Sequence, residues 1–144
     1  KALIDKLKKN QMLRMLRVGK FTIAVLEATL RRYLLERENE IPTLLMLRAA
    51  KSKLLERANN LLRLLAPRSL PIEETINFAG GGALPTEGLE GIALVVDTDV
   101  ETTRARLRKR GVIARVENER LYLEMRTVFD RDLKRLAEAI KACL

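Results

Sequence analysis

"GIALVVDTDVETTRARLRKRG", residues 91–111, contains the local signals that decide the fold of this 144-residue chain. Its opening run, residues 92–96, is apolar and rich in β-branched side chains, which predicts a strand. Residues 97–99 are Asp, Thr and Asp, and each is a residue type that can cap the start of a helix. Gly111 is a typical helix stop. The stretch therefore predicts a strand followed directly by a helix over 100–110.

Downstream of this stretch, the pattern predicts a β-hairpin and a final helix. "GVIARV" (111–116) and "RLYLEM" (120–125) read as two strands joined across residues 117–119. Asp130 is placed to cap the last helix. The apolar stripe of that helix is Leu133, Leu136, Ala137, Ile140 and Leu144.

Upstream, "LPIEETINF" (70–78) predicts another strand. From residue 68 onward the order is therefore β-β-α-β-β-α. We predict an α+β fold in which helices 100–110 and 130–143 pack on the same face of an antiparallel sheet.

The first 67 residues read as helical. Residues 1–17 predict one helix that ends at Val18-Gly19, and residues 20–36 predict a second that is apolar around most of its circumference, as a buried connector between domains would be. "RENEIPT" (37–43) is a polar break. A third helix begins near Ser52 and ends at Pro67, with one apolar stripe.

Composition excludes several classes of chemistry. The chain has no histidine, so it lacks the usual general base and the commonest metal ligand. A single cysteine, Cys143, argues against disulfides, thiolate metal clusters and a catalytic thiol, and it favours a cytoplasmic protein. No apolar run is long enough for a membrane span. The amide-poor usage, rich in Lys, Arg and Glu, fits a thermophilic source.

Positive charge is concentrated in two blocks. The chain carries 28 Lys and Arg against 19 Asp and Glu, a net charge of +9. Residues 1–20 hold seven basic side chains against Asp5 alone, and residues 101–110 hold five against Glu101 alone. Such blocks favour polyanions, nucleic acid above all, and a solvated helix face is an equally weighted alternative.

The first block contains an arginine pair, Arg14 and Arg17. On a helix, side chains at i and i+3 share a face, so both guanidinium groups could meet one anion. The alternative is a solvated helix end. Gly80, Gly81 and Gly82 form a second candidate, an active-site loop, although a bulged strand end is the favoured interpretation. The run lacks the Lys-Ser/Thr of a phosphate-binding loop.

Arg115 and Arg126 lie in the predicted hairpin strands. Arginine among apolar neighbours in a strand pairs with a carboxylate, which belongs either to the protein or to a substrate. A structural pairing is favoured. Both are kept as candidate anion contacts.

Four segments together resemble the C-terminal part of a known family. They are "LRMLRVGKFTIAVLEATLRRYL" (13–34), "IPTLLML" (41–47), "AGGGALP" (79–85) and "GVIARVENERLYLEMRTV" (111–128). In this order and spacing they resemble bacterial selenocysteine synthase, the seryl-tRNA(Sec) selenium transferases. The resemblance implies the fold-type-I architecture of pyridoxal-phosphate enzymes. Residues 1–19 would be the tail of the large cofactor-binding domain, 20–36 the connecting helix and 37–144 the small C-terminal domain.

The resemblance also implies an activity for the longer parent protein. The seryl hydroxyl on tRNA(Sec) leaves as water and selenium from selenophosphate takes its place, with pyridoxal 5'-phosphate as cofactor. Arg14 and Arg17 match the pair thought to hold the selenium donor. In this family the cofactor lysine lies upstream of the matched region, so the resemblance implies that these residues include no catalytic residue and that the fragment is inactive alone. It also implies that the parent protein is a homo-oligomer. Gly19, Leu45 and Ala83 depart from the family pattern, which puts any polar role at those positions in doubt.

Two other functions fit the same sequence. A related pyridoxal-phosphate lyase acting on a small amino compound would share the small domain, but the arginine pair and the basic excess suit selenophosphate and tRNA better. A stand-alone RNA-binding module is a rival from another class. Such modules stack bases on aromatic side chains, and aromatic residues make up 3% of this chain.

Overall fold

The computed structural model describes residues 2–14, 16–79 and 84–144. The chain divides into two compact units, Lys1–Leu44 and Leu45–Leu144, and each is described by itself. The first unit is helical. Its elements, with α3 crossing the division, are α1 (Ala2–Lys9), η1 (Gln11–Arg14), α2 (Lys20–Leu34), η2 (Glu38–Glu40) and α3 (Pro42–Leu47), where η denotes a 3-10 turn.

The predicted single helix over residues 1–17 is wrong, because α1 ends at Lys9. The side chain of Asn10 explains the break: its Oδ1 accepts a hydrogen bond from the backbone N–H of Met12 at 2.9 Å. Asparagine competes in this way with the helical hydrogen-bond ladder. The chain then forms the short η1 turn instead of a continued helix.

The predicted second helix is confirmed as α2, which runs from Lys20 to Leu34. Its apolar side chains were expected to be buried on several sides, yet no residue of α2 is buried in this chain. The polar break after it also holds a helix that the sequence did not reveal. Helix α3 begins at Pro42, and proline suits the first helical position because the N–H that it lacks would have no helical partner there.

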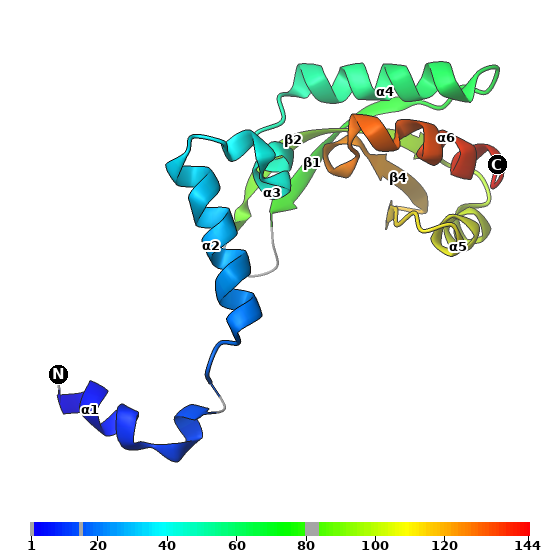
Figure 1. The fold of residues 1–144 in the computed structure, drawn as a ribbon. Helices are drawn as coiled ribbons and strands as arrows, with labels where there is room; N and C mark the ends of the chain where they lie inside the picture. Colours follow the sequence, from blue (N-terminus) through cyan, green and yellow to red (C-terminus); the bar gives the residue numbers. More distant parts are fainter. Residues whose placement is uncertain (1, 15, 80–83) are drawn as a thin grey trace. The chain divides into compact units, whose positions relative to one another are not determined.

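The second unit is an α+β domain, as predicted (Figure 1). Its four strands form one antiparallel sheet in the order β1-β2-β4-β3. The elements are α4 (Lys51–Leu65), β1 (Ile72–Ala79), β2 (Leu84–Val96), α5 (Val100–Lys109), β3 (Arg115–Glu117), β4 (Arg120–Glu124), η3 (Met125–Thr127), η4 (Asp130–Asp132) and α6 (Leu133–Lys141).

Two predicted turns are confirmed. Gly111 follows α5 with a φ of +79°, the left-handed conformation that glycine adopts without strain. The β3–β4 hairpin closes through Asn118 and Glu119, whose φ angles of 49° and 59° are both positive. Two positive φ angles match a type I′ turn, whose twist suits a two-residue hairpin. The first hairpin strand is shorter than predicted, because β3 spans Arg115–Glu117.

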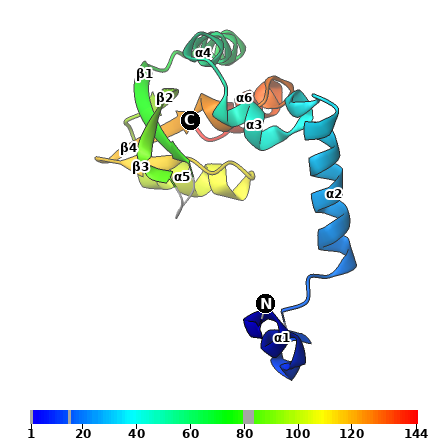
Figure 2. The ribbon, with the colours of Figure 1, turned by 90° about the vertical axis from the view of Figure 1, so that its left-hand side faces the viewer.

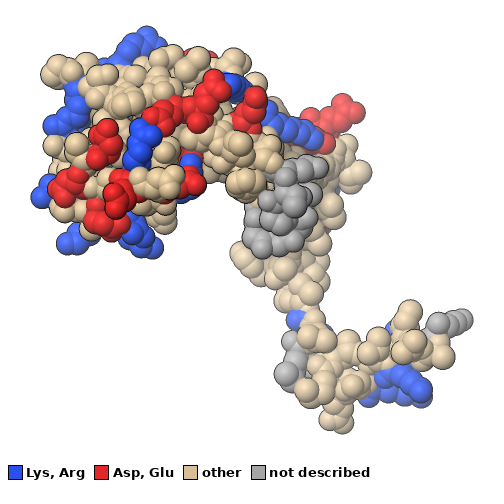
Figure 3. All heavy atoms as spheres, turned by 180° about the vertical axis from the view of Figure 1, so that it is seen from behind, with Lys and Arg blue, Asp and Glu red and all other residues tan. Residues whose placement is uncertain are grey.

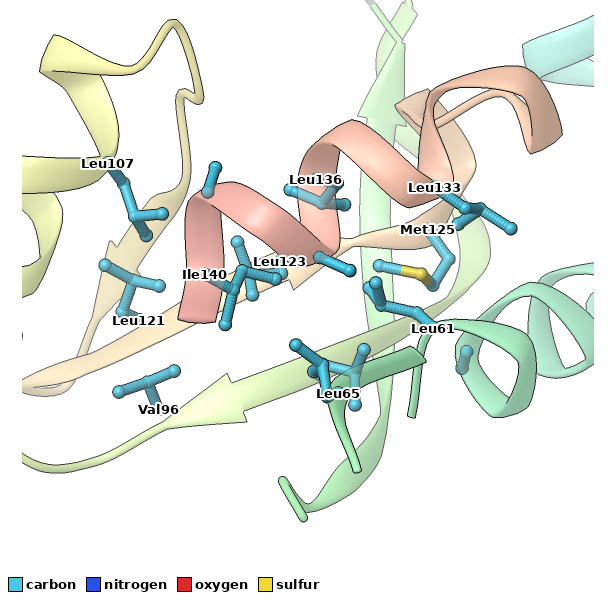
Figure 4. Close-up of a cluster of buried hydrophobic side chains, with 14 of the residues drawn as sticks. Leu61, Leu65, Val96, Leu107, Leu121, Leu123, Met125, Leu133, Leu136 and Ile140 are labelled. Atoms are coloured by element: carbon cyan, nitrogen blue, oxygen red, sulfur yellow. The ribbon is translucent and has the colours of Figure 1, made fainter. Parts of the chain in front are cut away.

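The main core lies between one face of the sheet and three helices, α4, α5 and α6 (Figures 1 and 2). Figure 4 shows Val96 of β2 and Leu121 and Leu123 of β4 facing Ile140 of α6. Every second strand residue points to this face, as the pleat requires. The prediction that helices 100–110 and 130–143 pack on the same face is therefore confirmed.

The predicted cap at Asp130 is wrong. Asp130 lies in η4, and its Oδ1 accepts a hydrogen bond from Arg57 Nε at 2.9 Å. Asp132 is the N-cap of α6, and it makes no side-chain capping bond. The carboxylate of Asp130 thus ties the start of this segment to α4 instead of satisfying the helix N-terminus.

Alanine at Gly91 is expected to lower the free energy of unfolding by about 1–3 kcal/mol through overpacking. A Cβ there would lie 2.4 Å from Thr75 Oγ1 and 2.8 Å from Asn77 Oδ1, which cross over the β2 backbone. Thr75 cannot turn away freely, because its Oγ1 donates a hydrogen bond to Glu124 Oε2 at 2.9 Å. Denaturant unfolding of Gly91→Ala measures the loss.

Gly88→Ala is the matched control on the same two strands. A Cβ at Gly88 would lie 2.6 Å from Cγ2 of Ile76, whose side chain is exposed and, unlike Thr75, makes no hydrogen bond that holds it in place. We expect this variant to lose less than about 0.5 kcal/mol. Equal losses for the two glycines would contradict the crowding account.

Candidate functional site

The arginine pair lies in the first unit, at the junction before α2. Arg14 is the last residue of η1, and Arg17 is exposed in the short segment between η1 and α2. Because α1 ends at Lys9, the pair does not lie on the single helix that the sequence predicted. Gly19 is the N-cap of α2 with an extended backbone (φ −67°, ψ 155°). Arg14 thus ends a 3-10 turn, and Arg17 lies in the segment that leads into α2.

The surroundings of this pair are electropositive. Residues 1–20 hold seven basic side chains against Asp5 alone. Among the residues that the structure describes, Arg17 has no acidic partner. An exposed guanidinium in such a segment can bind an anion without first breaking an ion pair.

The candidate loop Gly80–Gly82 lies outside the described residues, and its assignment stays a prediction. The strand that enters it is described. The β1–β2 register changes between Phe78, which faces Gly88, and Ala79, which faces Leu84. This register shift lies directly before the glycine run, where the sequence predicts a bulged strand end.

Arg126 is a buried arginine with main-chain partners. Its side chain lies in η3 and the residue is 7% exposed. Nη1 donates to the carbonyl oxygens at the end of α3 and just after it, and Nη2 donates to the carbonyl of β2. These acceptors are Met46 (2.8 Å), Leu47 (3.2 Å), Ala49 (3.2 Å) and Glu90.

Such a guanidinium closes the C-terminal end of a short helix onto the sheet. The carbonyls at a helix end have no partner within the helix, and a cation suits the negative end of its dipole. Nε of Arg126 is buried with no hydrogen-bond partner in the described part of the chain. The favoured structural interpretation of Arg126 thus has specific partners, although they are carbonyls and not the carboxylate that the sequence suggested.

Arg115 lies on the opposite face of the sheet, which no described helix of the second unit covers (Figure 2). It donates from Nη2 to Glu124 Oε1 at 2.8 Å and from Nη1 to Glu117. Its guanidinium carbon lies 4.6 Å from the ring centroid of Tyr122. Burial lowers the pKa of Arg115, but the hydrogen bonds that it donates to Glu124 and Glu117 outweigh this, so the pKa is raised.

A second ion pair crosses the same face. Arg120 Nη1 donates to Glu73 Oε2 at 3.1 Å, and its guanidinium lies 5.8 Å from the Tyr122 ring. The hydrogen bond to Glu73 raises the pKa of Arg120. Figure 3, which views the chain from behind, shows acidic and basic side chains interspersed over this part of the second unit.

This open face does not suit the base-stacking mode of an RNA-binding module. Tyr122 is buried, with Arg115 and Arg120 over its ring, so its π-face is not offered to a base. The arginines are paired with glutamates that sequence reasoning did not single out. For Arg120 the partner is Glu73 of β1, and for Arg115 the partners are Glu124 of β4 and Glu117 of β3.

The described residues offer neither a metal site nor a membrane span. No group of three or more potential metal-ligating side chains gathers in the part of the chain that the structure describes. Within those same residues, no helix has both the length and the apolar character needed to cross a bilayer.

Comparison with known proteins places this architecture in one family. The model of the family described as L-seryl-tRNA selenium transferase matches residues 1–129. The chain belongs to this family.

Named relatives agree with the family match. An L-seryl-tRNA(Sec) selenium transferase of Wolinella succinogenes is 48% identical over 97% of this chain, one of Aliarcobacter butzleri 40% over 98%, and one of Nautilia profundicola 37% over 100%. The match spans 32% of the length of each of these relatives. The resemblance found in four sequence segments is thereby confirmed along nearly the whole chain.

Proposed function

We propose that the full-length protein converts seryl-tRNA(Sec) to selenocysteinyl-tRNA(Sec), with selenophosphate as the selenium donor. The observation that carries this proposal is the family match over residues 1–129, together with relatives that bear the name L-seryl-tRNA(Sec) selenium transferase. The unneutralised positive charge around Arg17 supports it, because the selenium donor is an anion.

The arginine pair is the proposed donor site. Arg14 ends the 3-10 turn η1 and Arg17 lies shortly before α2, in a segment rich in basic residues. Guanidinium groups bind tetrahedral oxyanions through paired N–H donors, which fix the orientation of the anion as well as its charge. In this proposal the pair holds the donor, and the catalytic groups come from the remainder of the parent protein.

The described lysines do not fit the covalent anchor of pyridoxal phosphate. Such a lysine needs a desolvated site that lowers its pKa. Lys51 is half-buried, but its Nζ lies 2.6 Å from Glu74 Oε2, and that hydrogen bond raises the pKa of Lys51. The other described lysines are exposed. We derive no step through the cofactor from these residues, and we propose that this chain alone is inactive.

Treatment of the 144-residue chain with pyridoxal phosphate and borohydride is expected to give no stoichiometric adduct on a single lysine. Exposed lysines should instead carry scattered, substoichiometric label, because no desolvated site among the described lysines favours one of them. Mass spectrometry of a digest, against the chain treated with borohydride alone, measures this. One adduct per chain at one lysine would show that the anchor lies within these residues.

The activity itself is tested on the full-length parent. Purified enzyme, seryl-tRNA(Sec) and selenophosphate should yield selenocysteinyl-tRNA(Sec), followed by radioactive selenium on the tRNA. The matched control omits the donor, and a second control replaces the tRNA with seryl-tRNA(Ser). Transfer to neither tRNA would overturn the proposed function. Equal transfer to both would overturn the proposed substrate.

A further inference from the structure

Two helices of the second unit bring four basic side chains to one edge. Arg106 and Lys109 belong to the last turn of α5, and Arg110 is its C-cap. Arg135 belongs to α6. An arginine of each helix reaches the segment that follows the other helix. Arg106 Nη1 donates to the carbonyl oxygen of Cys143 at 3.4 Å, and a Cβ built on Gly111 would lie 3.9 Å from Arg135 Nη2. We call Arg106, Lys109, Arg110 and Arg135 the α5–α6 basic edge.

The positive charge of this edge is not neutralised. All four side chains are exposed, and none has an acidic partner among the described residues. The ion pair that α5 does make, Arg104 with Glu101 at 3.3 Å, lies toward its other end. The open sheet face is the internal contrast, because there Arg115 and Arg120 are each held by a glutamate.

Stabilisation of α5 explains why some of the basic residues of the α5–α6 basic edge are present, but it does not explain all of them. Basic residues in the last turn of α5 interact favourably with the negative end of its dipole. That explanation does not cover Arg135, which belongs to a different helix and lies beside the end of α5. Bringing a further guanidinium to three existing cations costs repulsion unless an anion is bound there.

We propose that the α5–α6 basic edge binds the phosphate backbone of tRNA. The identity of the RNA rests on the proposed function, and the location of the binding surface rests on the exposed cations. Cations on two packed helices present charge along a surface, which matches consecutive phosphates better than a single small anion. The outward side of α5 carries Thr102 and Ala105 instead of bulky apolar residues, so it lacks the apolar face that membrane insertion requires.

The test uses the 144-residue chain and a fluorescently labelled tRNA(Sec) transcript without the seryl group. The variant is Arg110→Gln with Arg135→Gln, which removes two charges and leaves Arg106 and its bond to Cys143. We expect about tenfold weaker binding at low salt. We also expect the slope of log K against log salt to fall by about two, one for each lost phosphate contact.

The matched control is Arg31→Gln with Arg63→Gln. It removes the same charge from exposed positions on α2 and α4, and it should keep the affinity and the slope of the unaltered chain. Equal losses in both double variants would mean that net charge alone drives binding, and would overturn the proposal. Unchanged RNA binding with weaker binding to vesicles of anionic phospholipid would overturn it in favour of a membrane surface.

The outcome is separable from that of the proposed function. RNA affinity is measured without any selenium chemistry, so a parent that fails to transfer selenium can still show the expected loss at this edge. Conversely, a parent that transfers selenium normally while the Arg110 and Arg135 variant binds tRNA(Sec) normally would retain the function and refute the edge.

Discussion

Alanine at Arg14 or Arg17 of the full-length protein is expected to abolish or severely reduce selenium transfer while leaving the affinity for seryl-tRNA(Sec) nearly intact. A hydrogen bond between charged groups contributes roughly 1.5–3 kcal/mol. Loss of one guanidinium therefore weakens donor binding by roughly 10-fold to 150-fold, before any loss of orientation. Turnover as a function of selenophosphate concentration, beside tRNA affinity as a function of salt, measures the two effects.

Lysine at the same positions should rescue poorly. It keeps the charge but lacks the planar fork that orients a tetrahedral anion. Arg31→Ala is the control, because Arg31 belongs to the same unit, is exposed and pairs with Glu27 at 2.8 Å. It should leave transfer unchanged.

A contact between the arginine pair and the tRNA backbone would give the opposite pattern. The alanine variants would then lose tRNA affinity in proportion to activity, the salt slope would become shallower, and lysine would restore most of the function. That result would refute the donor-site assignment for Arg14 and Arg17 and leave the family membership untouched.

Methionine at Arg126 is expected to lower the free energy of unfolding of the second unit by about 3–5 kcal/mol. The substitution keeps most of the apolar stem and removes every donor. Four main-chain carbonyls then lose their cationic partner, and those that stay buried carry an unpaid desolvation penalty. Guanidinium chloride unfolding followed by far-ultraviolet circular dichroism measures the change.

Two further variants separate this effect from a general loss of charge. Arg131→Met removes an exposed arginine near the start of α6, and it should change stability by less than about 0.5 kcal/mol. Arg126→Lys should recover less than half of the loss, because one ammonium cannot reach both the end of α3 and the Glu90 carbonyl. A loss below about 1 kcal/mol for Arg126→Met would contradict the role assigned to these bonds.

Sequence patterns predicted the second unit well because its signals are local. The strand over 92–96, the helix after it and the stop at Gly111 each depend on neighbouring residues, and the structure has all three. The hairpin turn at 118–119 is equally local. The shared helix face was predicted from the β-β-α-β-β-α order of the elements and the two amphipathic helices in it, and the structure confirms it.

The errors fall where a side chain finds a partner that periodicity does not register. The helical pattern continues past residue 10, but Asn10 turns to the backbone of Met12 and ends α1. Asp130 is a residue type that commonly caps helices and it precedes the last helix, yet its partner is Arg57, 73 positions earlier. The periodicity of apolar residues carries no information about either hydrogen bond.

The candidate site was less predictable than the fold. Arg115 and Arg126 were both selected from the sequence, but nothing local indicates that one meets glutamates and the other meets carbonyls 36 to 80 positions away. The arginine pair at Arg14 and Arg17 was selected from its spacing and its basic surroundings, and the family resemblance supplied its role as a donor site. The predicted helix that would have contained the pair ends at Lys9, and the role of the pair stays a prediction.

The partners of Arg126 also have an evolutionary consequence. Its acceptors are main-chain oxygens of Met46, Leu47, Ala49 and Glu90, and every residue type supplies the same oxygen. Side chains at those four positions can therefore drift without disturbing these bonds, whereas position 126 cannot. Correlated substitution between position 126 and its partners is not expected, so covariation methods, which infer contacts from paired changes, would miss the junction between α3 and the sheet.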